Sequence, residues 1–370
     1  MNDQPLIIGA GPTGLAAALF LSRKGIPSRI VDQTAEPAKE SRAQVVNPRS
    51  LELLAPSGVV ETMLAEGHAI HRTRFYEGWE MIAEIELGEA HPLYGMTVLP
   101  QARTEALLTE ALAQDGVHPE RGVALETLQQ DEAGVSVTLM HADGQRETTR
   151  APILLGADGA HSRVREALGI AFEGSAFPEP WPLYDLQLND PLDLESAHVS
   201  LVKGGLVFLL GLRPGFWRVF ADVPDPLDRL PPGTAQGDIG WHSTFQVSHR
   251  LAAREASGRV ALAGDAAHIH SPVAARGMNL GIEDAYVFAE CAAEALQGQG
   301  GRLEDFGRMR RQVHRKVIGR IRALTELARG QPDFVGALRR YLLPGMVKFP
   351  PTAHPMLRLL TGLDHEVTLC

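Results

Sequence analysis

A glycine-rich turn near the start of the chain constrains the fold more than any other feature. An apolar run, Leu6-Ile7-Ile8, leads directly into Gly9-Ala10-Gly11-Pro12-Thr13-Gly14, and an Ala/Leu-rich stretch follows. A second apolar run, residues 28–31, ends in Asp32, 18 residues after Gly14. The order strand, glycine turn, helix, strand and acid is typical of a dinucleotide-binding βαβ unit.

Each glycine of this turn has a physical role. Gly9 permits the tight turn out of the strand, Gly11 permits close approach of a pyrophosphate, and Gly14 permits close packing of helix on strand. The helix begins at Pro12 and Thr13, and its free N–H groups, which Pro12 itself lacks, are directed toward the phosphates. Asp32 is placed to hold a ribose hydroxyl. A plain glycine turn is the alternative, but the complete context favours the dinucleotide site.

Residues 5–22 are apolar enough to raise the possibility of a membrane helix or a secretory signal. Glycines and a proline interrupt the stretch, and no basic residue precedes it. A spanning helix needs about 20 unbroken apolar residues, and a signal needs a charged start. We therefore expect neither, and we predict no membrane association.

Composition narrows the class of protein further. The 370 residues are enough for about two domains. A net charge of −10 argues against a nucleic-acid binder. Two cysteines, Cys291 and Cys370, can form neither a disulfide framework nor a metal site. We predict a cytoplasmic protein without a metal, as a monomer or homodimer.

A second domain, built mainly of strands, is expected to interrupt the dinucleotide-binding part of the chain. Runs of strand-like residues, separated by proline and glycine at roughly 8–12 residue spacing, predict a largely antiparallel sheet. We predict a discontinuous dinucleotide-binding domain, formed by residues 1–70, 98–170 and 255–330. A substrate-binding sheet domain, residues 71–97 and 171–254, is inserted into it, and residues 331–370 form a short helical appendix.

Two helices are expected near the end of the dinucleotide-binding part. One covers residues 282–296, with Glu283 and Asp284 in its first turn, where acids complement the helix dipole. The other covers residues 303–328 and carries several basic residues, Arg310 among them. Such charge usually marks a solvated face.

Two further turns combine glycine with an acid after an apolar strand: Asp158-Gly159 and Gly264-Asp265. With the first turn, these motifs resemble the single-component FAD-dependent aromatic hydroxylases, the family of p-hydroxybenzoate hydroxylase. The resemblance covers roughly residues 5–330. It implies an α/β (α+β) fold with a Rossmann-like FAD-binding domain and an inserted, mainly antiparallel β-sheet substrate domain.

The resemblance also implies a set of FAD-binding residues. Arg42 matches a second clamp on the pyrophosphate, Gln101 a polar group near the ribityl chain, and Val123 a backbone contact to adenine. Asp158, Gly159 and Arg165 match a middle motif that supports FAD and is implicated in NAD(P)H binding, with Ser162 beside it. Asp265, after Gly264, matches the acid on the ribityl chain. The loop beside the isoalloxazine ring is matched by Pro272, Gly277, Met278 and Asn279.

One motif departs from the family pattern. The final loop often reads Gly-Gly before its last glycine, with one residue between. Here it reads Ala274-Ala275-Arg276-Gly277, which adds two methyl groups beside the expected ring position.

The resemblance implies a reaction. NAD(P)H reduces FAD, O2 forms a flavin C4a-hydroperoxide, and its terminal oxygen attacks an electron-rich aromatic carbon of a phenol-like or polycyclic substrate. No catalytic side chain is assigned. Five residues lie in segments that could face the substrate, although a structural role is the commoner one for each: His71, Tyr94, Tyr184, His242 and His249.

Other functions stay open on the same scaffold. They are a reductase, a halogenase, an antibiotic-degrading monooxygenase, or a non-catalytic flavin-binding redox sensor. Flavin halogenases usually carry Trp-x-Trp-x-Ile-Pro, and this chain has only Glu179-Pro180-Trp181-Pro182, which disfavours that branch.

Overall fold

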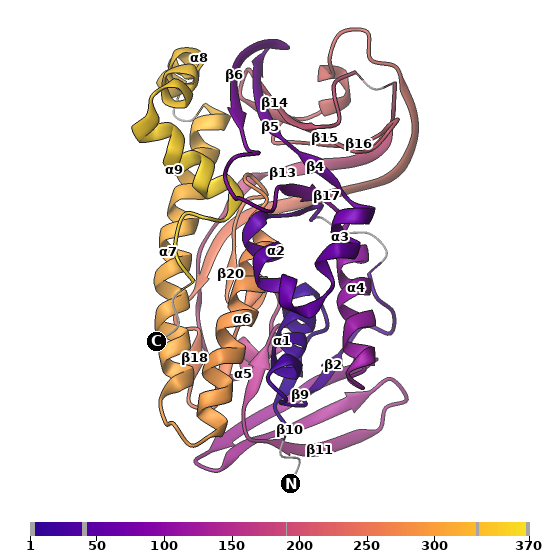
Figure 1. The fold of residues 1–370 in the computed structure, drawn as a ribbon, viewed down its shortest axis with the longest axis vertical. Coiled ribbons are helices and arrows are strands. Elements are labelled where there is room, and N and C mark those ends of the chain that lie inside the picture. Colours follow the sequence, from indigo (N-terminus) through magenta and orange to yellow (C-terminus); the bar gives the residue numbers. More distant parts are fainter. Residues whose placement is uncertain (1–3, 39–42, 190, 331–332, 368–370) are drawn as a thin grey trace.

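Two sheets dominate the computed structural model, which describes residues 4–38, 43–189, 191–330 and 333–367 (Figure 1). The first has six strands, of which five run parallel, and β18 at one edge is antiparallel to its neighbour. In spatial order these six are β18 (Ala256–Ser257), β19 (Val260–Leu262), β12 (Leu154–Gly156), β1 (Leu6–Ile8), β2 (Arg29–Asp32) and β8 (Glu120–Arg121).

The second sheet has eight strands and is antiparallel except where β14 pairs with β5. In spatial order its strands are β20 (His268–Ile269), β17 (Gln236–Ala252), β13 (Phe172–Leu188), β16 (Phe216–Ala221), β15 (Gly205–Arg213), β14 (Ser196–Val202), β5 (Arg72–Glu77) and β6 (Glu80–Glu86). Most of its strands lie in the upper part of the molecule in Figure 1, whereas β20 lies lower, near α6.

Two three-stranded sheets complete the described strands. One is β11 (Arg146–Ala151), β10 (Gly134–His141) and β9 (Val123–Asp131), and the other is β3 (Val45–Val46), β7 (Met96–Val98) and β4 (His68–Ile70). The helices are α1 (Pro12–Arg23), α2 (Pro48–Leu54), α3 (Val60–Glu66), α4 (Gln101–Gln114), α5 (Arg163–Ala167), α6 (Gly277–Leu296), α7 (Arg302–Arg329), α8 (Asp333–Lys348) and α9 (Pro350–Thr361), with the 3-10 turns η1 (Ala55–Ser57), η2 (Pro226–Arg229) and η3 (Gly264–Ala266).

Apolar packing of helices on the parallel sheet forms the largest core. Leu15 and Leu19 of α1, Leu108 of α4 and Phe288 of α6 are all fully buried in it, together with Ile7 of β1. Helix α1 is buried along most of its length, as its Ala/Leu-rich sequence requires. No described helix is long and apolar enough to cross a membrane.

The two sheet types confirm the predicted fold class. The predicted domain limits stay a prediction. One helix boundary was wrong: α6 begins at Gly277 rather than Ile282, so Glu283 and Asp284 lie in its second turn and are fully buried. The glycine-rich start hid the helix, because Gly277 and Gly281 are poor helix formers that tertiary packing overrides.

Candidate active site

The β1–α1 turn needs each of its glycines for a different reason. Gly9 has φ +106°, and a Cβ there would lie 2.2 Å from the Ala157 carbonyl oxygen. A Cβ at Gly14 would lie 1.9 Å from the Gly9 oxygen, so helix and strand can approach only without it. At Gly11 no atom lies within 4 Å of the Cβ position, and this residue lines a cavity. Of the three glycines, only Gly11 therefore leaves room for a ligand.

The Asp32 carboxylate is held beside this turn at the end of β2. Its Oδ2 accepts a hydrogen bond from the Ala10 N–H at 2.7 Å, and its Oδ1 accepts from the Thr34 N–H at 2.7 Å. The Arg121 guanidinium lies 3.8 Å from Oδ1. The Asp32 carboxylate thus lies beside the glycine turn, as the sequence predicted. Arg42, the expected second clamp on the pyrophosphate, lies outside the described residues.

In the middle motif, Gly159 lines the cavity, whereas the Arg165 side chain contacts the final motif. The Arg165 guanidinium donates to the Ala266 and Ala160 carbonyls, both at 2.9 Å, and lies 4.0 Å above the Phe172 ring. Asp158 accepts from the Val164 N–H at 3.1 Å, and burial raises the pKa of its carboxyl. These contacts give Arg165 and Asp158 a positioning role.

The final motif is fitted against the first. Gly264 has φ +58°, and a Cβ there would lie 2.5 Å from Thr13 Oγ1. Asn279 does not line the cavity: its side-chain amide donates to the Val45 and Ala275 carbonyls at 2.8 Å, and its oxygen accepts from the Asn47 N–H at 2.9 Å. Asn279 therefore restrains the loop before α6 without contacting the cavity.

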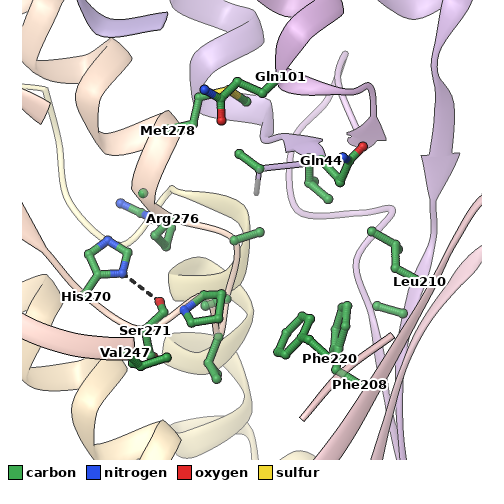
Figure 2. Close-up of a pocket in the computed structure, with 18 of the residues that line it drawn as sticks. Gln44, Gln101, Phe208, Leu210, Phe220, Val247, His270, Ser271, Arg276 and Met278 are labelled. Carbon is green, nitrogen blue, oxygen red and sulfur yellow. Dashed lines mark hydrogen bonds between the residues drawn. The ribbon is translucent and has the colours of Figure 1, made fainter. Parts of the chain in front are cut away.

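A cavity of about 480 Å³ runs between these motifs and the eight-stranded sheet (Figure 2). Nine of the predicted residues line it: Gly11, Pro12, Thr13, Gln101, Gly159, Asp265, Pro272, Gly277 and Met278. Eight do not: Gly9, Gly14, Asp32, Val123, Asp158, Arg165, Gly264 and Asn279. The Val123 side chain, on β9, is buried in a hydrophobic core, and the expected backbone contact to adenine stays a prediction.

The far part of the cavity is an apolar chamber under the eight-stranded sheet. Phe208 and Phe220 stack with ring centroids 4.5 Å apart, and Figure 2 shows them across the cavity from Gln101 and Met278. Further strands add apolar side chains to the same wall: Phe75, Leu183, Val199, Leu210 and Phe245. The sequence placed strands here but could not say which faces point inward.

Several lining residues were missed. None of the five candidate bases from the sequence lines the cavity, whereas His270, Arg218 and Arg276 do. His268-Ile269-His270 follows the final glycine-acid turn, and the two histidines two residues apart could have drawn attention to His270. Arg218 is buried and pairs with Asp185 through two 2.7 Å contacts, which no local pattern predicts.

Comparisons with known proteins agree with this geometry. Residues 3–203 and 228–320 match the model of a protein family described as "FAD binding domain". A 6-methylpretetramide 4-monooxygenase from Streptomyces rimosus is 34% identical over 88% of this chain and 62% of its own length. A rifampicin monooxygenase from Streptomyces venezuelae is 33% identical over 97% of this chain and 78% of its own.

This chain belongs to the FAD-dependent aromatic hydroxylase family. A solved structure of p-nitrophenol 4-monooxygenase from Pseudomonas putida has the same fold, with a TM-score of 0.89 at 22% identity over 98% of both chains. The chain spans less than two thirds of the length of the 6-methylpretetramide 4-monooxygenase it matches.

The residues present fit the FAD cofactor of this family. Helices α1 and α6 both begin at the cavity, and neither has a side-chain N-cap or an acid in its first turn. Their positive ends can therefore face the negative charge of a pyrophosphate and of a flavin ring. The open Cβ position at Gly11 leaves space for the phosphate approach.

The loop before α6 carries backbone strain at the departure from the family pattern. Ala274 has φ +76° and Ala275 has φ +51°, both in the left-handed region that favours glycine. Such conformations cost roughly 1–3 kcal/mol each and persist only where the surroundings impose them. The family's usual glycines would adopt this shape at little cost.

A buried charge network lies behind the final motif. The Asp284 carboxylate accepts from His268 and His314 at 2.8 Å, from Arg310 at 2.6 Å and from the Gly264 N–H at 3.0 Å. The expected solvated position of Arg310 was therefore wrong, since only 2% of its side chain is exposed. Its buried partners lie on α6, and helical spacing on α7 alone cannot reveal them.

The ligand atoms of His268, Asp284 and His314 lie within 4.8 Å of one another, a spacing a metal ion could use. The Arg310 guanidinium already occupies the same carboxylate, so a metal ion would face a positive charge at close range. We therefore interpret the cluster as a hydrogen-bonded ion network.

This network predicts a pH-dependent stability. Burial alone would lower the pKa of His314, but the charges of Asp284 and Glu255 raise it to about 9. The Arg310 guanidinium, 3.5 Å from Nε2, and the His268 ring, 4.0 Å away, also face this imidazole. Because the pKa is higher in the folded state, the stabilisation is complete below about pH 6.5 and is lost as the pH rises toward 9. The thermal midpoint should fall across that window.

The His314→Gln variant should have a lower midpoint at pH 6 and a flatter midpoint-versus-pH curve between 6.5 and 9. Differential scanning fluorimetry in matched buffers measures both. The exposed His118→Gln variant is the control and should keep the wild-type slope. An unchanged slope in His314→Gln would refute the role of this imidazole.

Proposed function

We propose that this chain is an FAD- and NAD(P)H-dependent monooxygenase that hydroxylates a phenol-like or polycyclic aromatic molecule with O2. The observation that carries the proposal is the continuous cavity, which joins the N-termini of α1 and α6 to the apolar chamber. Bound FAD supplies the redox chemistry, by taking a hydride from NAD(P)H and delivering one atom of O2 to the substrate. We also propose that the protein is cytoplasmic and is a monomer or a homodimer.

The chain's own residues bind and orient the two reactants. Gly11 and Thr13 line the cavity at the start of α1, and Gly277 and Met278 line it at the start of α6. Backbone N–H groups there can stabilise negative charge on the flavin ring as it is reduced. We assign Asp265, which lies on η3 and lines the same cavity, to the ribityl chain.

The apolar chamber positions an aromatic ring and excludes water. The stacked Phe208 and Phe220 rings offer flat apolar faces to a planar substrate. Exclusion of bulk water strengthens electrostatic interactions and suppresses side reactions of the bound flavin.

His270 offers a hydrogen-bond acceptor to a substrate hydroxyl. Its Nδ1 lies 2.9 Å from the Ser271 carbonyl oxygen, which can only accept, so Nδ1 carries the proton and Nε2 the lone pair. Burial lowers the pKa of this imidazole to about 3, so the ring is neutral. Among the described residues Nε2 has no hydrogen-bond partner. It can therefore accept a hydrogen bond from a phenolic O–H and orient that group, while a pKa this low makes the ring too weak a base to remove the proton.

The test is NAD(P)H oxidation by the FAD-loaded protein in air, with mass analysis of products. The panel contains phenols, nitrophenols and chlorophenols, because relatives of the family act on such compounds, and polycyclic aromatics including rifampicin and anhydrotetracycline. We expect at least one compound to accelerate oxidation and to gain one oxygen atom. Assays without an arene and with hydrogen peroxide detection are the controls.

The outcomes separate the competing functions. A chlorinated product in the presence of halide would favour the halogenase, and a reduced product without oxygen incorporation would favour the reductase. If neither NADH nor NADPH reduces the bound flavin with any arene present, the monooxygenase proposal is wrong and the redox-sensor alternative leads.

A further inference from the structure

The Arg276 side chain links the loop beside the cavity to the last part of the described chain. Its guanidinium is fully buried, and its Nη1 donates to the Leu359 carbonyl and to Asp364 Oδ1, both at 3.0 Å. Its Nη2 lies 3.4 Å from Glu283 Oε1. The Asp364 carboxylate is 2% exposed, so this ion pair is shielded from solvent.

The segment that follows α9 is held by several contacts of its own. His365 Nε2 lies 2.7 Å from Glu283 Oε2, and its Nδ1 lies 3.2 Å from Asp364 Oδ1. A Cβ at Gly362 would lie 2.4 Å from the Asn47 side chain, which shows how closely the segment packs on the start of α2. Figure 1 shows this segment passing between α7 and α2.

The ion pair is adjacent to the strained turn. Arg276 directly follows Ala274 and Ala275, whose left-handed backbone requires restraint from outside the loop. Within the loop, the Ala275 N–H donates to the Pro272 carbonyl at 3.0 Å. Leu360 of α9 lines the cavity together with both alanines, so the same helix forms part of the wall and anchors the loop.

We propose that the Asp364–Arg276 ion pair is a clamp by which the C-terminal segment holds the Ala274–Ala275 turn in the shape that the flavin-binding loop requires. Asp364 is thus a positioning residue that acts on the cofactor site through Arg276. The clamp takes over the restraint that glycines make unnecessary in relatives with the usual motif. The inference rests on the proposed function only through the bound flavin and is independent of the substrate.

The test uses the full-length Asp364→Asn variant. We expect FAD to bind roughly tenfold or more weakly, as when an outer group that orients a ligand-binding residue is lost. The visible spectrum and the midpoint potential of the remaining bound flavin should also shift. Fluorescence titration with FAD and spectroelectrochemistry measure these quantities without any substrate, so a failure of the hydroxylation proposal would not affect the result.

Two further variants separate the clamp from general stabilisation. Arg320, 51% exposed, donates to Asp364 Oδ2 at 2.9 Å from the outside, so Arg320→Gln removes a partner of the same carboxylate and leaves Arg276 in place. It should bind FAD as the wild type does. Adding Ala274→Gly and Ala275→Gly to Asp364→Asn should recover most of the lost affinity, because glycine adopts positive φ without strain.

Three outcomes would overturn the proposal. The first is an Asp364→Asn protein with unchanged FAD affinity, spectrum and potential. The second is an equal loss of affinity in Arg320→Gln. The third is the absence of recovery with the glycine pair. If Asp364→Asn alone does not fold, the proposal still requires the glycine pair to restore a folded protein that binds FAD.

Discussion

Replacement of Asp284 by asparagine should lower the free energy of unfolding by about 3–5 kcal/mol, the cost of breaking a buried ion pair from one side. Both carboxylate oxygens accept two hydrogen bonds each, from Arg310 and His314 at Oδ1 and from His268 and the Gly264 N–H at Oδ2. An amide nitrogen at either position would face donors, and the Arg310 charge would lose its closest partner. The carboxylate is 0% exposed, so water cannot compensate.

Urea unfolding of the apoprotein, followed by circular dichroism, measures this loss as a lower midpoint at unchanged slope. Glu126→Gln is the matched control, because Glu126 also pairs with an arginine, Arg146, through two 2.8 Å contacts, but on the surface. Its midpoint should stay at the wild-type value, since exposed ion pairs contribute little. Equal midpoints for Asp284→Asn and the wild type would show that the network is not stabilising.

The local part of the site could be predicted because its physical causes are local. A strand, a glycine turn and a helix occupy consecutive residues, and the positive φ of Gly9 and the close contact of Gly14 with the Gly9 oxygen both arise within that unit. Gly264 has a local reason too, its φ of +58°, whereas its close contact with Thr13 joins two motifs about 250 residues apart and could not be predicted. Wherever a motif defines its own geometry, the sequence predicts the structure well.

The buried charges could not be predicted because their causes are distant in sequence. Arg310 looks like any basic residue on an amphipathic helix, and only the packing of α7 on α6 places it against Asp284. Asn279 matches a flavin-loop motif, yet its amide restrains Val45 and Ala275 rather than facing the cavity. Sequence similarity therefore located the site but did not separate residues that face the ligand from those that position them.

The contacts of the last described segment were also not predicted from the sequence. Its proline-containing helices suggested an appendix, because nothing in residues 331–370 resembles a ligand motif. The structure instead places Leu360 in the cavity wall and Asp364 on Arg276. The alanines at positions 274 and 275 were visible as a departure, but their positive φ angles and the restraint they require were not.

The Asp265→Ala variant should lose FAD. Asp265 is exposed on the cavity wall, on the short turn η3. Loss of a hydrogen bond to a charged group costs about 1.5–3 kcal/mol, which corresponds to roughly 10- to 100-fold weaker binding. The ratio of flavin to protein absorbance after purification, followed by titration of the apoprotein with FAD, measures the loss.

A matched variant decides whether the effect belongs to the cofactor site. Asp228 also lies exposed on a 3-10 turn, η2, but away from the cavity, so Asp228→Ala should retain stoichiometric FAD. Asp265→Asn should be intermediate, because its amide can still hydrogen-bond a hydroxyl without the charge. The thermal midpoint of apo Asp265→Ala should equal that of the wild-type apoprotein, since the Asp265 side chain is exposed and fills no core position. Full retention of FAD by Asp265→Ala would remove this carboxylate from the site and shift the ribityl contact to another residue on the cavity wall.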